Sequence, residues 1–272
     1  MQHIKAYGIT SMMFLSERYV MFAAFREVED VEPCLLVADL LSMAATDPRT
    51  PRELGNTFTF YFPPFANSVL VQNFYIRSNP QPTREPEQVP FSTASDNRLC
   101  VTYFRVYDDG QSLCFVAFAS SFLSLIEIAA RCNMKRFEWY MWVPDNCRII
   151  PKMYYSNVWF LAMYGTKVVA KRSPRGRQAY LDVYDFNQLA LRKEEKDLNR
   201  GTDERAIKGW KCVSAPAVFR AGDVFKCEVE TRLGYRLKSW AIPRELSSCS
   251  PMCSEDGIIL VVSQTAIQAW HL

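Results

Sequence analysis

Few residues in this 272-residue sequence could carry acid–base or nucleophilic chemistry. Its two histidines, His3 and His271, lie near opposite ends of the chain. A nucleophilic site needs a Ser or Cys within hydrogen-bonding reach of a base that a third group orients, and neither histidine has such neighbours in the sequence. No glycine pattern matches a phosphate-binding loop. We therefore expect no enzymatic activity and no cofactor.

Cysteines and aspartates give no stronger signal. Cys249 and Cys253 could supply two thiolate ligands to a metal ion, but no second Cys or His pair at matching spacing follows. We expect two loop cysteines and no metal. Asp182 and Asp185 are three residues apart in an expected strand, so they lie on opposite faces and cannot act as a paired acid and base. We expect Asp185 to bind a turn.

The strongest basic cluster lies in loop 167–177 and consists of Lys167, Lys171, Arg172, Arg175 and Arg177. Nucleic-acid binding would need aromatic side chains between these cations for stacking, and Tyr164 and Tyr180 only flank the cluster. The net charge of +3 is also too balanced to indicate a nucleic-acid or membrane partner. We interpret the cluster as a solvated loop, and binding of nucleic acid or a phosphorylated ligand through residues 167–177 stays as an alternative.

Six tryptophans supply the largest side chains: Trp139, Trp142, Trp159, Trp210, Trp240 and Trp270. Most are expected to pack between strands, because aromatic residues dominate such cores. One or two could instead line a surface groove and anchor a protein partner. The candidate binding residues are Trp139, Trp142, Arg148, Lys167, Arg172 and Arg175.

Composition is that of a folded protein rich in β-structure. Hydrophobic residues make up 49% of the chain, charged residues 22% and aromatic residues 14%. The nine cysteines are odd in number and stand mostly in apolar runs, which suits a reducing compartment. No signal peptide is recognised, and no apolar run reaches the roughly 18 residues that span a bilayer. We expect a cytoplasmic or nuclear protein without a membrane partner.

Short apolar runs broken by Gly, Pro, Asn and Asp predict strands along most of the chain, with residues 139–187 at the centre of the pattern. The clearest hairpin joins residues 99–106 to 113–119 through Asp109-Gly110. Residues 122–128 are expected to continue as a strand. The proline-rich segment 78–90 is expected to be a loop, and for the charged segment 188–208 we favour a loop over a short helix.

An internal rhythm predicts repeated units. Similar strand endings close at residues 40, 128, 186 and 272, and are thus 88, 58 and 86 positions apart. Propeller blades repeat at about 40–45 residues and contain four short strands each. The sequence therefore predicts a single all-β domain, residues 1–272, of about five to six β-propeller-like (WD-repeat-like) blades that form an incomplete or irregular propeller. A β-sandwich or another barrel is the alternative.

A family resemblance is carried by motifs in the central stretch. They are Phe137-x-Trp139-x-x-Trp142-x-Pro144-x-Asn146-x-Arg148, then Tyr164-Gly165-x-Lys167, then Leu181-Asp182-Val183-Tyr184-Asp185-Phe186-Asn187. In this order they resemble the C-terminal region of F-box proteins from mushroom-forming fungi. Two positions depart from the family pattern, since Tyr164 stands where the family usually has His and Lys167 replaces its Arg. The likeness extends over nearly the whole chain.

The resemblance implies a propeller-like substrate-recognition region of a ubiquitin-ligase receptor, and hence a protein partner. The family's F-box has no counterpart in this sequence, so docking to the ligase adaptor is not carried over. The leading expectation is a protein-interaction module. A truncated or partner-dependent fragment without independent function is the alternative.

Overall fold

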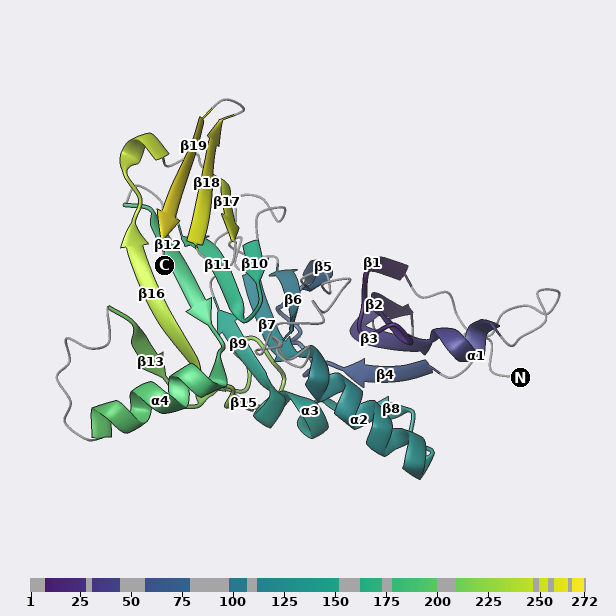
Figure 1. Ribbon diagram of the computed structural model, residues 1–272. Coiled ribbons are helices and arrows are strands. Elements are labelled where there is room, and N and C mark those ends of the chain that lie inside the picture. The colour runs from purple at the N-terminus through teal and green to yellow at the C-terminus, as the bar shows by residue number, and fades with distance from the viewer. Residues whose placement is uncertain are drawn as a thin grey trace, which may run out of the picture.

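The computed structural model describes residues 8–27, 31–44, 57–78, 98–106, 112–151, 162–172, 178–199, 209–246, 250–253, 257–263 and 266–271. These residues form mostly strands, arranged in several open sheets (Figure 1). The predicted all-β class is therefore confirmed, although four α-helices interrupt the sheets. The loop 79–90, the hairpin turn 107–111, Arg175, Cys249, Trp159 and His3 lie outside the described residues.

Sheet 1 is an antiparallel meander that follows the chain order, extended by one short parallel strand. Its strands are β1 (Gly8–Phe14), β2 (Tyr19–Glu27), β3 (Val31–Asp39), β4 (Thr57–Tyr61) and β8 (Arg136–Phe137). A tight turn joins β1 to β2, in which the Leu15 N–H donates to the Tyr19 carbonyl at 2.8 Å. Helix α1 (Leu40–Ala44) follows β3 directly. The apolar runs at residues 9–15, 19–25, 34–40 and 57–61 predict strands, and β1 to β4 confirm a strand at each of these places.

Sheet 2 repeats the same order with β5 (Val71–Ser78), β6 (Leu99–Val106), β7 (Ser112–Phe118) and β9 (Cys147–Pro151). The predicted hairpin of β6 and β7 is confirmed by their antiparallel register. Almost every residue of these two strands is buried, since apolar side chains fill both faces. Such continuous apolar strands belong in a sheet that is covered on both sides.

Two helices stand between β7 and β9, and both correct an expected strand. Helix α2 (Ala119–Cys132) buries Phe122, Ile126 and Ala129, a spacing of four and three residues that suits a helix and not a strand. Helix α3 (Trp139–Asn146) buries Trp142 and Val143. Both expectations were wrong because short apolar runs alone do not separate a buried strand from a buried helix turn.

Sheet 3 consists of β10 (Ala162–Tyr164), β11 (Lys167–Arg172), β12 (Tyr180–Asp185), β16 (Tyr235–Ala241) and β13 (Lys211–Val213), in this spatial order. Between β12 and β13 lies helix α4 (Gln188–Asn199), so the loop predicted from residue 188 is wrong as far as residue 199. The Asn187 side-chain oxygen accepts the N–H groups of Leu189 and Ala190, each at 3.1 Å, and thereby starts the helix.

Helix α4 approaches sheet 3 at one glycine. Leu191 is its buried apolar contact, and a Cβ at Gly234 would lie 2.6 Å from the Leu191 methyl carbon. The rest of the helix is mostly charged: Glu194 pairs with Arg236 of β16, and Lys193 and Lys196 are exposed. This run of charges explains why the sequence alone resembles a loop. Any larger residue at position 234 would force the Leu191 side chain to shift.

The last described strands form two smaller sheets. Strands β14 (Ala217–Phe219) and β15 (Val229–Thr231) pair with each other. The apolar run at residues 224–229 predicts a strand, but only Val229 belongs to one, so this prediction is wrong for residues 224–228. After the 3-10 turn η4 (Arg244–Leu246), sheet 4 is an antiparallel meander of β17 (Ser250–Cys253), β18 (Gly257–Ser263) and β19 (Ala266–His271).

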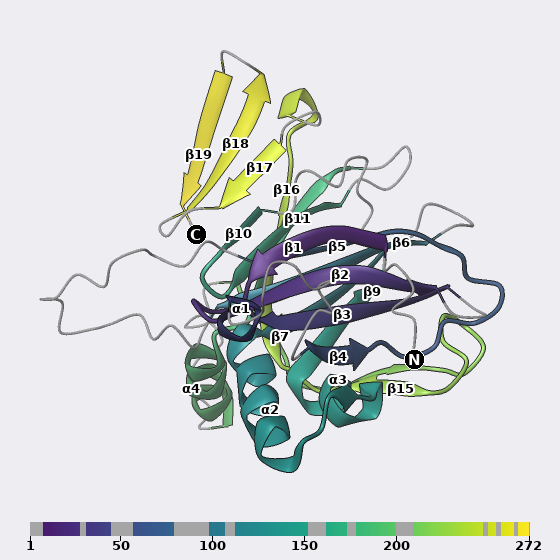
Figure 2. The same ribbon diagram turned by 90° about the vertical axis from the view of Figure 1, so that its right-hand side faces the viewer.

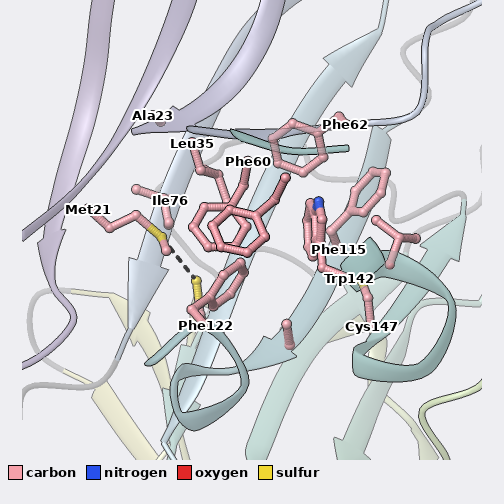
Figure 3. Packing of buried hydrophobic residues seen from close by; sticks show 14 of the residues in the cluster. Met21, Ala23, Leu35, Phe60, Phe62, Ile76, Phe115, Phe122, Trp142 and Cys147 are labelled. Carbon is pink, nitrogen blue, oxygen red and sulfur yellow. Dashed lines mark hydrogen bonds between the residues drawn. The ribbon is translucent and has the colours of Figure 1, made fainter. Parts of the chain in front are cut away.

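Sheets 1 to 4 follow one another in space, with an apolar layer between each pair (Figures 1 and 2). The largest layer lies between sheets 1 and 2 and includes α2 and α3; there Phe60 stacks on Phe137 with ring centroids 4.3 Å apart (Figure 3). A second layer joins sheets 2 and 3, and a third joins sheets 3 and 4. The first strands lie close in two of these pairs of sheets, since β1 contacts β5 and β10 contacts β17.

Candidate protein-binding surfaces

Trp142, a predicted contact residue, belongs to the core. It is only 2% exposed, and its indole Nε1 donates to the Tyr61 carbonyl at 2.9 Å. Its ring packs edge-on against Phe60 and Phe62 (Figure 3). The prediction of Trp142 as a surface contact is therefore wrong, because the helical turn of α3 directs this side chain inward.

Arg148 is likewise a structural residue. It is buried in β9, its Nη1 donates to the Ala215 carbonyl at 2.8 Å, and its guanidinium carbon lies 5.0 Å from the Tyr235 ring centroid. These contacts join sheet 2 to the segment after β13 and to sheet 3. A buried cation with such partners is not available to a ligand, so this prediction is also wrong.

The described part of the basic cluster, residues 167–172, forms strand β11 and not the predicted solvated loop, and its Arg172 is engaged within the protein. The Arg172 guanidinium donates to both oxygens of Asp182, at 2.8 and 3.3 Å, and lies 4.8 Å from the Tyr180 ring centroid. The hydrogen bond to Asp182 raises the pKa of Arg172 further. Lys167 is half-buried in the same strand and has interactions of its own. The nucleic-acid alternative therefore loses Arg172 as a free cation.

Asp182 and Asp185 have separate structural roles, as the strand pattern predicted. Asp182 also accepts a hydrogen bond from the Ser239 hydroxyl at 2.6 Å. Asp185 accepts from the Thr166 hydroxyl at 2.7 Å in the turn between β10 and β11, and it pairs with Arg236. The prediction that Asp185 binds a turn is confirmed.

No group of three or more metal-ligating residues is found within the described ranges. The cysteines described there carry free thiols. Burial raises the pKa of Cys34 and of Cys100 to about 12, so neither thiol is a thiolate at neutral pH. No helix of the described part is long and apolar enough to cross a membrane.

One predicted residue does stand at the surface. Trp139, the first residue of α3, is half-buried, and its ring meets the Tyr140 ring edge-on with centroids 6.1 Å apart. The next two side chains point outward, with Tyr140 62% and Met141 37% exposed. We call Trp139, Tyr140 and Met141 the α3 patch. The exposed charged residues Arg136, Glu138 and Asp145 flank it in sequence.

The fixed position of the α3 patch follows from the helix beneath it. Trp142 and Val143 anchor α3 in the core, and the Met141 N–H donates to the Glu138 carbonyl at 2.9 Å. Sequence analysis selected Trp139 and missed Tyr140 and Met141. A helical reading of residues 139–146 would have found them, because positions 139, 142 and 143 share one side of a helix, and positions 140 and 141 lie on the other side.

A second apolar surface lies on β1. Ile9, Met12 and Phe14 are 52%, 62% and 59% exposed, and we call them the β1 stripe. Met13 between them is buried against sheet 2. The register pairs Ile9 with Ala24, Met12 with Phe22 and Phe14 with Val20, and a bulge after Ile9 brings it to the same face as Met12.

Sequence analysis expected a strand at the β1 stripe but no surface. The signal was the near-continuous apolar run of residues 9–15, which predicts a strand covered on both faces. In the structure one face is covered by sheet 2 and the β1 stripe stands on the other.

Comparison with protein-family models, with curated proteins and with solved structures gives no match.

Proposed function

We propose that this protein is a non-enzymatic interaction module that binds another protein through the α3 patch. The observation that carries the proposal is a cluster on a helix whose other face is packed in the core: the exposed side chains of Tyr140 and Met141 beside the half-buried ring of Trp139. Tryptophan and tyrosine are enriched among residues that dominate binding energy at interfaces, and methionine adapts to irregular apolar partners.

The charged surroundings of the α3 patch support the same function. Arg136, Glu138 and Asp145 are exposed beside it. Asp145 is held in place by Arg232, whose Nη1 donates to its Oδ1 at 2.8 Å. Interfaces typically combine a buried aromatic centre with a polar, solvated rim. The α3 patch therefore has the composition of a contact site of moderate size.

The architecture in this proposal is an open, propeller-like fan. Sheets 1 and 2 each follow the order first to fourth strand, and sheet 3 keeps it for β10, β11, β12 and β16. The first strands lie together in sheets 1 and 2 and again in sheets 3 and 4. This repeated arrangement supports blades around an axis. The expected five to six blades exceed sheets 1 to 4, so an incomplete ring is the form that fits the described residues.

The family resemblance suggests the class of partner. A relative of fungal F-box substrate receptors would use this region to bind a target protein inside the cell. The proposal does not include a link to the ligase adaptor, because no residue of this sequence matches the F-box. Catalysis plays no part in it.

The test places a photo-crosslinking amino acid at Tyr140, with the same substitution at Val218 as the matched control. Val218 is 54% exposed and lies on β14, outside α3. We expect a crosslinked protein that is specific to position 140 and that unlabelled protein competes away, whereas the Tyr140→Ala, Met141→Ala double variant does not compete. Identical products at positions 140 and 218, or full competition by the double variant, would reject the α3 patch.

A further inference from the structure

Helix α4 separates its charges between two sides. Glu194 and Glu195 turn toward sheet 3, where Glu194 pairs with Arg236 of β16 and Glu195 accepts a hydrogen bond from the Ser214 hydroxyl. The exposed residues between positions 188 and 197 are Leu189, Arg192, Lys193 and Lys196. Their spacing of three, one and three residues places them on one side of a helix. The outward side of α4 therefore presents three cations and no exposed carboxylate.

Beside α4, cations and tryptophan rings alternate on one face of sheet 3. Arg236, Lys238 and Trp240 are alternate residues of β16 and thus point the same way. The Arg236 guanidinium carbon lies 4.9 Å from the ring centroid of Trp210, the residue before β13. The Lys238 Nζ lies 5.6 Å from the Trp210 centroid and 4.9 Å from the Trp240 centroid. We call these four residues the cation–tryptophan row, and all four are half-buried.

The cation–tryptophan row and α4 are contiguous. Arg236 joins them, because it pairs with Glu194 of the helix and lies over the Trp210 ring. Helix α4 also contacts both β13 and β16 (Figure 1). Lys211, on β13, is exposed and adds a further cation to this part of sheet 3.

Most of the positive charge of this surface is not neutralised within the described residues. Arg236 is the exception, since Asp185 and Glu194 pair with it and hold it in place. In the described part of the chain, Lys238 contacts the two tryptophan rings and pairs with no carboxylate. The surface therefore complements an anionic partner.

We propose that this surface binds single-stranded nucleic acid, with phosphates on the cations of α4, Lys211 and Lys238, and with bases on the Trp210 and Trp240 rings. Proteins that bind unpaired strands combine cations along the backbone with aromatic rings on which bases stack. An acidic peptide would use the cations but has no flat base for the rings. The inference uses neither the α3 patch nor the β1 stripe.

Lys238 has two roles in this proposal. In the free protein its ammonium group lies over both rings and keeps them in position. Stacking of a base on a tryptophan ring is stronger than a cation–π contact near the surface, so a base can displace the ammonium group. The freed side chain is long enough to turn toward a neighbouring phosphate, and the ring contact is exchanged for an ion pair.

The experiment measures fluorescence anisotropy of a labelled oligothymidylate of about 15 nucleotides with the full chain at low salt. We expect a micromolar dissociation constant, quenching of tryptophan fluorescence, and binding at least about tenfold weaker to a duplex of the same length, because paired bases cannot stack on the rings. Salt should weaken binding steeply, since each neutralised phosphate releases counterions.

Matched variants test each part of the surface. Lys196→Glu should raise the dissociation constant at least about fivefold, whereas Arg131→Glu, which also reverses an exposed charge in the last turn of a helix, should change it less than about twofold. Trp240→Leu should raise it at least about fivefold, and Phe14→Leu, at an exposed ring of sheet 1, should not. Urea unfolding shows whether each variant is folded, and Trp210→Leu replaces Trp240→Leu if that variant is not.

Three results would overturn the proposal. The first is no binding of the oligothymidylate at low salt. The second is equal binding of the duplex together with no effect of either tryptophan substitution, which would leave only nonspecific attraction of charge. The third is equally effective competition by polyglutamate of the same length, which would assign the surface to an acidic protein segment.

Discussion

The α3 patch and the β1 stripe are both exposed and apolar, but they are exposed for different reasons. The α3 patch lies at the start of a helix whose inner face is complete, and charged residues surround it in sequence. The β1 stripe is one row of an apolar sheet face, beside Val20, Phe22 and Ala24. An aromatic cluster with a charged rim suits a separate protein, whereas an apolar sheet face suits another sheet.

The difference teaches that exposure alone does not define a binding site. In α3, removing the exposed side chains would leave the core intact. In sheet 1, the exposed row is the edge of a layer that strands normally bury on both faces. We therefore assign partner binding to the α3 patch and not to the β1 stripe.

The largest effect expected concerns the two tryptophans of α3. Trp142→Ala should reduce the free energy of unfolding by about 3–5 kcal/mol, because it opens a cavity between Phe60 and Phe62 and leaves the Tyr61 carbonyl without its donor. Trp139→Ala should cost no more than about 1.5 kcal/mol, since its side chain is half-buried. Urea denaturation checks both values. Equal losses would contradict the separation of α3 into a core face and a binding face.

The next effect in size is a difference in thiol reactivity between sheet 1 and helix α2. Cys34 lies opposite Ala24 in sheet 1, and burial raises its pKa to about 12. Cys132, the last residue of α2, is exposed. Because the thiolate is the reactive form, Cys132 should be labelled by a maleimide at least about a hundredfold faster than Cys34 at pH 7.5.

Mass spectrometry of timed samples gives both labelling rates, and Cys132→Ser should remove the fast phase. The rate at Cys34 should rise steadily as the pH approaches 12 in the folded protein. Fast labelling of Cys34 at neutral pH would mean that sheet 1 is open around β3, and the comparison with α2 would fail.

Salt should produce the smallest effect and sharpen the comparison most. Exposed charges more than about 10 Å apart are screened at 0.1 M salt. Crosslinking at position 140 should therefore fall several-fold between 0.05 and 0.5 M NaCl, because Arg136, Glu138 and Asp145 flank the α3 patch. Crosslinking from a probe at Phe14 should change less than about twofold over the same range, because the β1 stripe is uncharged. Equal salt sensitivity at positions 14 and 140 would contradict this assignment.

Strands could be predicted from the sequence where polar and apolar residues alternate clearly, or where β-branched and aromatic residues form a continuous run. The pattern Thr57–Tyr61 and the hairpin of β6 and β7 are examples. Helices α2 and α3 could not be separated from strands, because both consist of apolar residues over a short length. Helix α4 begins at a cap by Asn187 and packs through Leu191. In the sequence, neither feature stands out from the run of charged residues around it.

The candidate site was harder to predict, because residue type does not determine burial. Trp142 and Arg148 have the side chains that interfaces favour, yet both hold the core together. Trp139 was found because it belongs to the same motif. Met12 and Phe14 could be assigned to a strand, but only the three-dimensional order of the sheets shows which face sheet 2 covers.

The most direct test of the account places the same photo-crosslinker at Tyr140 in one sample and at Phe14 in another. We predict that the probe at position 140 attaches to a different protein, and that unlabelled protein competes this product away, whereas the probe at position 14 does not give the same product. The same competed product from both positions would contradict the account.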